Sequence, residues 1–159
     1  MNYPAIVTKD RRTLVALFPD CPGCGTQAEP GESIEDQAHE ALAGWLESML
    51  AARDIPSPPS RKVRAPRGAR VLRVPVPAVL AVRLLFIWGR RQAGLSQAEL
   101  AARAGISQQQ VARLEHPDTN PTLETLAKVA RALGTDLVVG LEPPSARVRP
   151  AAPGATLRG

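Results

Sequence analysis

Two cysteines, Cys21 and Cys24, are spaced closely enough to act together in metal binding or redox chemistry. Cys21 and Cys24 enclose Pro22-Gly23 in a C-x-x-C pattern, which could hold a metal ion or act as a redox pair. Zinc takes four ligands, however, and the chain has no further cysteines, while its two histidines, His39 and His116, are far apart in sequence. A thioredoxin-like pair opens a helix, whereas this pair lies in a Pro-Gly turn after an apolar run. We interpret the motif as a structural turn, with metal binding and redox chemistry as alternatives, and we expect no metal site and no cofactor.

The second candidate is a group of polar residues in the stretch SQAELAARAGISQQQVARLE, residues 96–115. Its pattern predicts two short helices joined by a turn at Gly105, which can adopt the left-handed conformation. Apolar residues are assigned to the inside of this helix-turn-helix: Leu100, Ala101, Ile106, Val111 and Leu114. This arrangement leaves Gln108, Gln109 and Arg113 on the outside of the second helix.

Residues 78–140 resemble the Xre/Cro/lambda-repressor family of DNA-binding domains. The matching text is Gly94-Leu95-Ser96-Gln97 with Glu99-Leu100-Ala101, then Gly105-Ile106-Ser107, the Val-x-x-Leu-Glu that ends at Glu115, and Pro121-Thr122-Leu123. In that family the second motif helix lies in the major groove. The resemblance implies that DNA is contacted by Gln97, Ser107, Gln108, Gln109 and Arg113.

Each of these positions has a distinct expected role. Gln97 would donate to a phosphate, and Gln108 and Gln109 would read bases, because a glutamine amide can pair with the N6 and N7 atoms of adenine. We expect Arg113 either to contact a phosphate or to pair with Glu115 inside the protein.

The N-terminal part resembles the HicB-type antitoxin family over about residues 3–76. The residues that carry this resemblance are Phe18-Pro19-Asp20-Cys21-Pro22-Gly23-Cys24-x-Thr26, Gly31-Glu32-Ser33-Ile34-Glu35-Asp36-Gln37-Ala38 and Ile55-Pro56-x-Pro58. The resemblance implies a partial RNase H-like domain that binds and blocks a HicA-type mRNA interferase toxin. It leaves the toxin-binding residues unknown.

An RNase H-like fold raises the alternative of a metal-dependent nuclease. That chemistry needs several carboxylates that converge on metal ions. The apolar run Leu14–Phe18 contributes none, and the flanking Asp10 and Asp20 are typical turn residues. We therefore expect no catalytic residues and no enzymatic activity.

The elements that must position these residues follow from periodicity and capping. Alternating and apolar runs predict strands at 3–8, 13–18, 25–28 and 70–76, and the run at 14–18 is expected to be a central strand covered on both faces. Ser33 is predicted to cap an amphipathic helix that covers the sheet, and the Pro-rich residues 55–69 to form a loop. Four further helical segments are predicted at 78–93, 96–104, 107–115 and 122–133, with capping boxes at Ser96 and Ser107.

Charge is distributed unevenly along the 159 residues. Residues 1–55 hold nine acidic and four basic residues, a net of −5, whereas residues 56–159 hold six acidic and 16 basic residues, a net of +10. The basic part suggests a polyanion as partner, and the acidic part a cationic protein surface. No run reaches the length of a membrane span and no signal sequence is recognised, so we expect a cytoplasmic protein without a membrane partner.

These observations together predict an α+β chain in which a β-β-β-α-β domain precedes an all-α helix-turn-helix domain. The expected domains are 1–76 and 77–142, followed by a disordered tail at 143–159. The resemblance implies an antitoxin that neutralises a HicA-type toxin and represses its own operon as a homodimer or higher oligomer on operator DNA. A phage-like repressor with an effector-binding N-terminal domain is the alternative. The apolar Leu137-Val138-Val139 and Leu141 are expected either to pair two copies or to close the domain.

Overall fold

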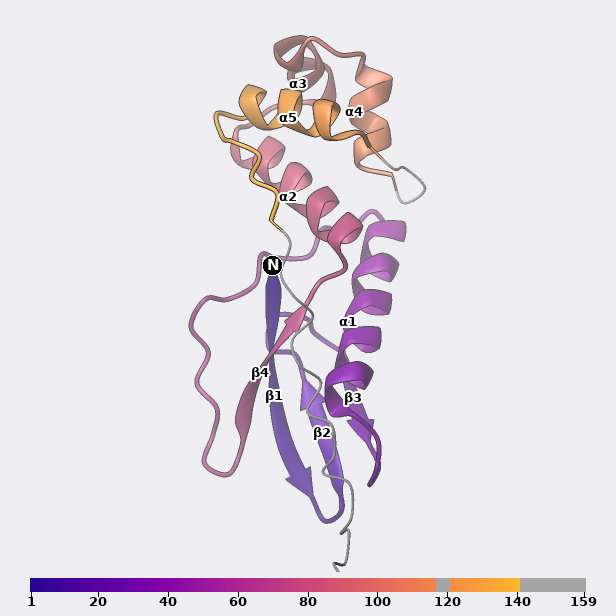
Figure 1. The fold of residues 1–159 in the computed structure, drawn as a ribbon, viewed down its shortest axis with the longest axis vertical. Helices are drawn as coiled ribbons and strands as arrows, with labels where there is room; N and C mark the ends of the chain where they lie inside the picture. The colour runs from indigo at the N-terminus through magenta and orange to yellow at the C-terminus, as the bar shows by residue number, and fades with distance from the viewer. Residues whose placement is uncertain (117–120, 141–159) are drawn as a thin grey trace, which may run out of the picture.

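The computed structural model describes residues 1–116 and 121–140, and its fold is α+β (Figure 1). The elements follow in the predicted order, with four strands and one helix before a group of four helices. Their bounds are β1 Asn2–Asp10, β2 Thr13–Leu17, β3 Gly25–Ala28, α1 Ile34–Ala51, β4 Arg70–Pro75, α2 Ala78–Gln92, α3 Gln97–Ala104, α4 Gln108–Leu114 and α5 Leu123–Ala132. Helices α2 to α5 gather at one end of the sheet.

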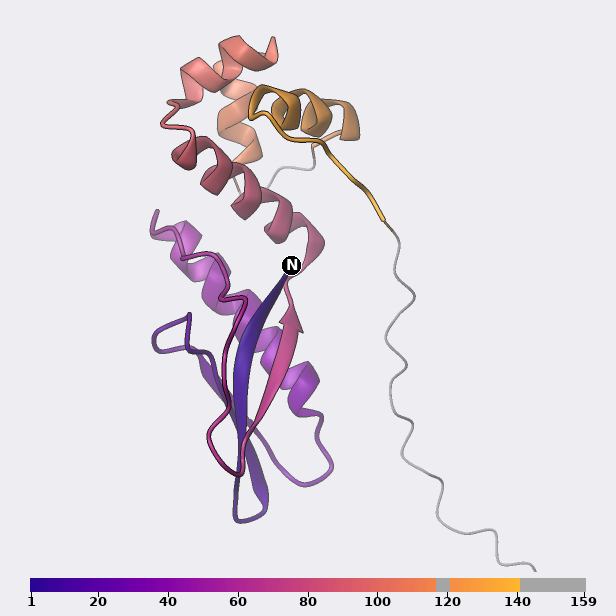
Figure 2. The same ribbon diagram turned by 90° about the vertical axis from the view of Figure 1, so that its left-hand side faces the viewer.

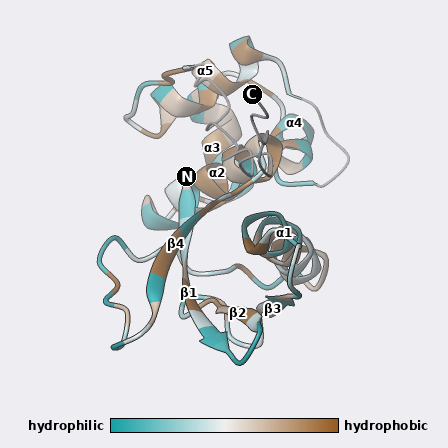
Figure 3. Cartoon of the chain, turned by 60° about the horizontal axis from the view of Figure 1, so that its bottom comes forward, coloured by the Kyte–Doolittle hydropathy of each residue, from teal (hydrophilic) through white to brown (hydrophobic). Residues whose placement is uncertain are grey.

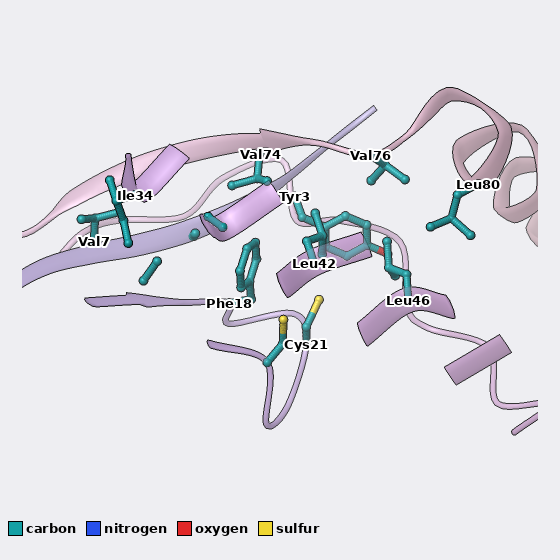
Figure 4. Packing of buried hydrophobic residues seen from close by; sticks show 14 of the residues in the cluster. Tyr3, Val7, Phe18, Cys21, Ile34, Leu42, Leu46, Val74, Val76 and Leu80 are labelled. Atoms are coloured by element: carbon teal, nitrogen blue, oxygen red, sulfur yellow. The ribbon is translucent and has the colours of Figure 1, made fainter. Parts of the chain in front are cut away.

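The sheet is antiparallel, with the strand order β3-β2-β1-β4. Helix α1 lies across one face of it (Figure 3). The first hydrophobic cluster fills the space between sheet and helix, with Tyr3 and Phe18 from the sheet side against Leu42 and Leu46 of α1 (Figure 4). As predicted, Ser33 caps α1, because its Oγ accepts a hydrogen bond from the backbone N–H of Asp36 at 3.1 Å.

Strand β2 is interior to the sheet, as predicted, but the expectation that both of its faces are covered is wrong. Alternate residues of a strand point to opposite faces. Ala16 is buried under α1, whereas the next residue, Leu17, is 59% exposed on the other face. The apolar run could not show this, because the sequence does not indicate that α1 covers only one face of the sheet.

The Pro-rich loop between α1 and β4 is tied to the sheet at specific points. Asp20, in the turn after β2, accepts hydrogen bonds from the backbone N–H and the hydroxyl of Ser60, both at 2.7 Å. The Tyr3 hydroxyl donates to the carbonyl oxygen of Ser57 at 2.6 Å. Asp20 is therefore the turn residue that was expected, with an additional role as an anchor for the loop.

Helix α2 contributes to two hydrophobic clusters. Leu80 and Leu84 lie in the first cluster, whereas Phe86 lies in a second cluster formed with α3, α4 and α5. Trp88 adds a hydrogen bond from its indole N–H to the carbonyl oxygen of Pro56 at 2.8 Å. The division of the chain at residue 77 stays a prediction, and the proposed tail at 143–159 lies outside the described residues.

Candidate nucleic-acid interface

The candidate interface is the helix-turn-helix formed by α3 and α4. The turn between them contains Gly105, whose φ of 64° is the left-handed conformation that the sequence predicted. A side chain at this position would have space around it, so the backbone conformation is what favours glycine. Ile106 follows and packs partly buried against the second cluster.

Both motif helices begin with the predicted capping boxes. The backbone N–H of Ser96 donates to Glu99 Oε2 at 2.8 Å, and the N–H of Glu99 donates to Ser96 Oγ at 3.2 Å. The equivalent bonds join Ser107 and Gln110 at 2.9 and 3.1 Å. Backbone N–H groups that a helix start leaves unpaired are satisfied in this way, which fixes where each helix starts.

The apolar side of the motif faces the second cluster. Its buried members in the motif and the neighbouring helices are Phe86, Leu95, Leu100, Ala101, Val111, Leu114, Leu126, Val129 and Ala130. Because Val111 and Leu114 point inward, Gln108, Gln109 and Arg113 of α4 remain exposed. The exposure of these three residues agrees with their predicted position, and their role on DNA stays a prediction.

A charged network joins α2, the start of α3 and the end of α4. Arg90 of α2 forms two bonds with the carboxylate of Glu115, Nε to Oε1 at 2.6 Å and Nη2 to Oε2 at 2.8 Å. Arg90 Nη1 also donates to the carbonyl oxygen of Leu95 at 2.9 Å. The bonds with Glu115 raise the pKa of Arg90, so the guanidinium stays charged. The carboxylate of Glu115 thus pairs with Arg90 and not with Arg113, the partner that the sequence offered.

Gln97 takes part in the same network. Its side-chain N–H donates to Glu115 Oε2 at 2.9 Å, and the residue is half-buried. A glutamine amide carries two N–H donors, so one remains for a phosphate. In the same way Ser107 uses its oxygen as an acceptor in the capping box and keeps its hydroxyl hydrogen as a donor.

The cysteine pair has the geometry of a structural turn. The N–H of Cys24 donates to the carbonyl oxygen of Cys21 at 2.9 Å, and the indole N–H of Trp45 on α1 donates to the carbonyl oxygen of Pro22 at 3.2 Å. Burial raises the pKa of the Cys21 thiol to about 12 and that of Cys24 to about 11. Thiols that stay protonated at neutral pH are poor nucleophiles.

Groups that could hold a metal ion are not brought together in the described ranges. Within residues 1–116 and 121–140, no three His, Cys, Asp or Glu side chains form such a group. Asp10 lies at the end of β1, where it pairs with Thr13 in the register, and Asp20 holds the loop. No helix of the described part is long and apolar enough to cross a membrane.

Comparison with known proteins matches the helix-turn-helix part to a family model and most of the chain to two antitoxins. The helix-turn-helix family HTH_3 matches residues 88–139. Antitoxin HicB 1 of Photorhabdus laumondii is 30% identical over 143 residues, which cover 89% of this chain and 88% of the relative. Antitoxin HicB 2 of the same organism is 28% identical over 86% of this chain and 94% of the relative. A solved HicA3 and HicB3 toxin-antitoxin complex matches with a TM-score of 0.43 and 28% identity, over 48% of this chain and 99% of that chain.

Proposed function

The chain belongs to the HicB antitoxin family, and we propose that it neutralises a HicA-type toxin and represses its own operon by binding operator DNA. The single observation that carries this proposal is the match to Antitoxin HicB 1, which spans 89% of this chain and therefore includes both the sheet and the helix-turn-helix. Both activities are binding activities, so the proposal requires neither catalysis nor a cofactor. Since the proposed targets are operator DNA and a toxin that acts on mRNA, the proposal includes a cytoplasmic location.

In the DNA-binding part, α4 enters the major groove with its N-terminal end. Gln108 and Gln109 occupy the first turn of α4 and are exposed, so their amides can reach base edges. Arg113 lies further along the same helix and Gln97 at the start of α3, where each can donate to a phosphate. Ser107 caps α4 and adds a hydroxyl donor at the same end.

Operator binding also requires two copies, because one helix-turn-helix reads a single half-site. An apolar groove of about 580 Å³ lies between α2, α5 and the first residues after α5, and its lining includes Val82, Leu85 and Leu137. The segment that follows α5 forms neither helix nor strand over 135–140 and exposes 88% of Val138 and 62% of Val139. Leu137 closes the second cluster of its own chain, whereas the two valines do not.

Each copy therefore offers both an apolar groove and an exposed apolar segment, which is the self-complementarity of a two-fold dimer. Because Thr135, Asp136 and Leu137 of the same chain already line the groove, we assign its open part to Val138 and Val139 of a second copy. Light scattering should give a dimer for the natural chain and a monomer after Val138→Asp. The matched control is Val79→Asp, since Val79 on α2 is also exposed but does not line the groove. A dimer that persists in the Val138 variant contradicts this assignment.

In the toxin-binding part, acidic residues gather on the exposed side of α1. Asp36, Glu40 and Glu47 are exposed there, and Glu35 pairs with Arg70 of β4 at 2.7 Å. A toxin that cleaves mRNA needs a cationic surface for its substrate, and an acidic protein surface complements it. This part would thus compete with RNA for the toxin.

The experiment that tests the proposal uses the protein encoded by a short reading frame adjacent to the gene for this chain. The tagged full-length chain should co-purify with that protein, and the complex should protect two half-sites about one helical turn apart in the DNA upstream of the gene. A basic neighbouring protein that does not bind the chain, together with an unprotected upstream region, refutes the proposal.

A further inference from the structure

A pocket of about 610 Å³ lies where the sheet part and the helix-turn-helix meet. It opens between the C-terminal end of α1, the last turns of α2, the start of α3 and the end of α4. Its lining includes Arg53, Arg90, Arg91, Gln97, Glu115 and His116. Figure 2 shows the ends of α1 and α2 on the same side of the molecule. The volume is in the range of ligand sites.

The charge of this pocket is positive. Glu115 is the acidic residue of its lining, and the bonds with Arg90 neutralise that carboxylate. Arg53 and Arg91 are also in the lining, and both are exposed. No described residue forms an ion pair with either of them. Two positive charges therefore remain after the internal pairing, and they come from the two different parts of the chain.

The end of α1 fixes the position of Arg53. The N–H of Arg53 donates to the carbonyl oxygen of Leu50 at 3.1 Å and the N–H of Asp54 donates to that of Met49 at 2.9 Å. These two bonds form a Schellman motif, in which Arg53 has a φ of 61° at the position that usually holds glycine. The helix therefore ends with an arginine in the pocket lining, at a position where the more usual glycine would bring no charge.

We propose that this pocket is a phosphate-binding site that takes a backbone phosphate of the bound DNA, with Arg53 and Arg91 as the contacts. This inference rests on the proposed DNA-binding function, because Gln97, a candidate phosphate contact at the start of α3, is also in the lining. A DNA backbone in contact with Gln97 would therefore lie at the edge of the pocket. The arginine guanidinium is the side chain best suited to phosphate oxygens.

The consequence is that the sheet part contributes directly to DNA binding. Arg53 follows α1, the helix whose exposed acidic side is the proposed surface for the toxin. A phosphate in the pocket would join the end of that helix to the helix-turn-helix. Binding of toxin and binding of DNA would then influence each other through a shared element.

The test compares three single variants of the full-length chain: Arg53→Gln, Arg91→Gln and the control Arg11→Gln. Arg11 has a similar left-handed φ of 53° and is exposed, but it lies in the turn between β1 and β2 at the far end of the sheet (Figure 1). The probes are the DNA upstream of the gene and a scrambled duplex of equal length, over a series of salt concentrations. A lost phosphate contact should weaken binding to both duplexes by similar factors and reduce the salt slope by about one unit.

We expect this reduction for Arg53→Gln and Arg91→Gln, about two units for the double variant, and no change for Arg11→Gln. If both pocket variants keep the salt slope of the natural chain, the inference is overturned. The proposed function is unaffected by that result as long as the natural chain prefers the upstream DNA to the scrambled duplex. A natural chain that binds the upstream DNA no better than the scrambled duplex refutes operator recognition instead.

Inorganic phosphate and ATP separate a backbone phosphate from a free ligand. If either raises the melting temperature of the natural chain but not that of the Arg53 variant, and the salt slopes are unchanged, the pocket takes a free phosphate compound. That result also overturns the assignment to DNA. If phosphate displaces the DNA only at ionic strengths where other salts displace it equally, the assignment to a DNA phosphate is supported.

Discussion

Replacing Glu115 by glutamine should lower the free energy of unfolding, because it weakens the hydrogen bonds of this residue with Arg90 and Gln97. The natural carboxylate accepts two bonds from Arg90 and one from Gln97. The side chains of Arg90 and Glu115 are only 14% and 13% exposed, so the lost charge leaves the guanidinium poorly solvated. Breaking a fully buried pair costs about 3–5 kcal/mol. Because the amide oxygen of the introduced side chain would still accept one bond and the Leu95 carbonyl still accepts another, we expect about 2 kcal/mol.

The assay is thermal and urea unfolding of the full-length chain, followed by circular dichroism. A loss of about 2 kcal/mol lowers the melting temperature by about 4–8 °C in a chain of this size. Glu124→Gln is the matched control, since Glu124 pairs with Lys128 at 2.8 Å on the open surface of α5, with side chains 77% and 45% exposed. That pair should contribute nothing measurable. Equal midpoints for the two variants would show that the network does not hold the motif helices together.

Three other predictions concern base reading by α4, the two thiols, and the packing of α2 on the first cluster. Gln108→Ala and Gln109→Ala should each reduce the binding free energy by about 1–3 kcal/mol on the upstream DNA and by little on a scrambled duplex. Arg113→Ala should weaken binding to both duplexes and lower the salt slope by about one. Equal losses on both duplexes for the glutamine variants contradict base reading. The thiols of Cys21 and Cys24 should resist alkylation at pH 8 in the folded chain and react after unfolding, because burial raises their pKa values to about 12 and about 11. Rapid labelling of the folded chain argues against the turn as described. Since thiols of the unfolded chain ionise near pH 9.0, the free energy of unfolding should fall as the pH rises above that value. Leu84→Ala should cost about 2–5 kcal/mol in urea unfolding, as Leu84 is fully buried between α2 and the sheet part; a loss below about 1 kcal/mol means that α2 does not complete the first cluster.

The sequence was sufficient to predict the elements and the exposed residues of α4. Local signals decide these features: Ser33, Ser96 and Ser107 each cap the helix that was expected to follow, and Gly105 has the left-handed conformation that the turn requires. Because Val111 and Leu114 mark the inner side of α4, the outer side follows from the helical period.

Features that depend on distant parts of the chain were missed. Arg90 and Glu115 are 25 residues apart, and the sequence offers the nearer Arg113 as a partner with equal charge. The bonds between Asp20 and Ser60 span 40 residues across a loop that has no periodicity. The dual packing of α2 was also hidden, because apolar residues on two sides of a helix do not indicate which cluster each side joins.

The most direct test of the central claim is RNA cleavage by the purified toxin from the adjacent reading frame. Labelled mRNA is incubated with the toxin while the full-length chain is added in increasing amounts, and the fraction of intact RNA is measured. The chain should be mixed with the toxin before RNA is added, with a heat-unfolded sample of the same chain as control. The proposed function predicts that cleavage stops when the folded chain reaches a stoichiometric amount. Cleavage that continues undiminished in a large excess of folded chain contradicts it.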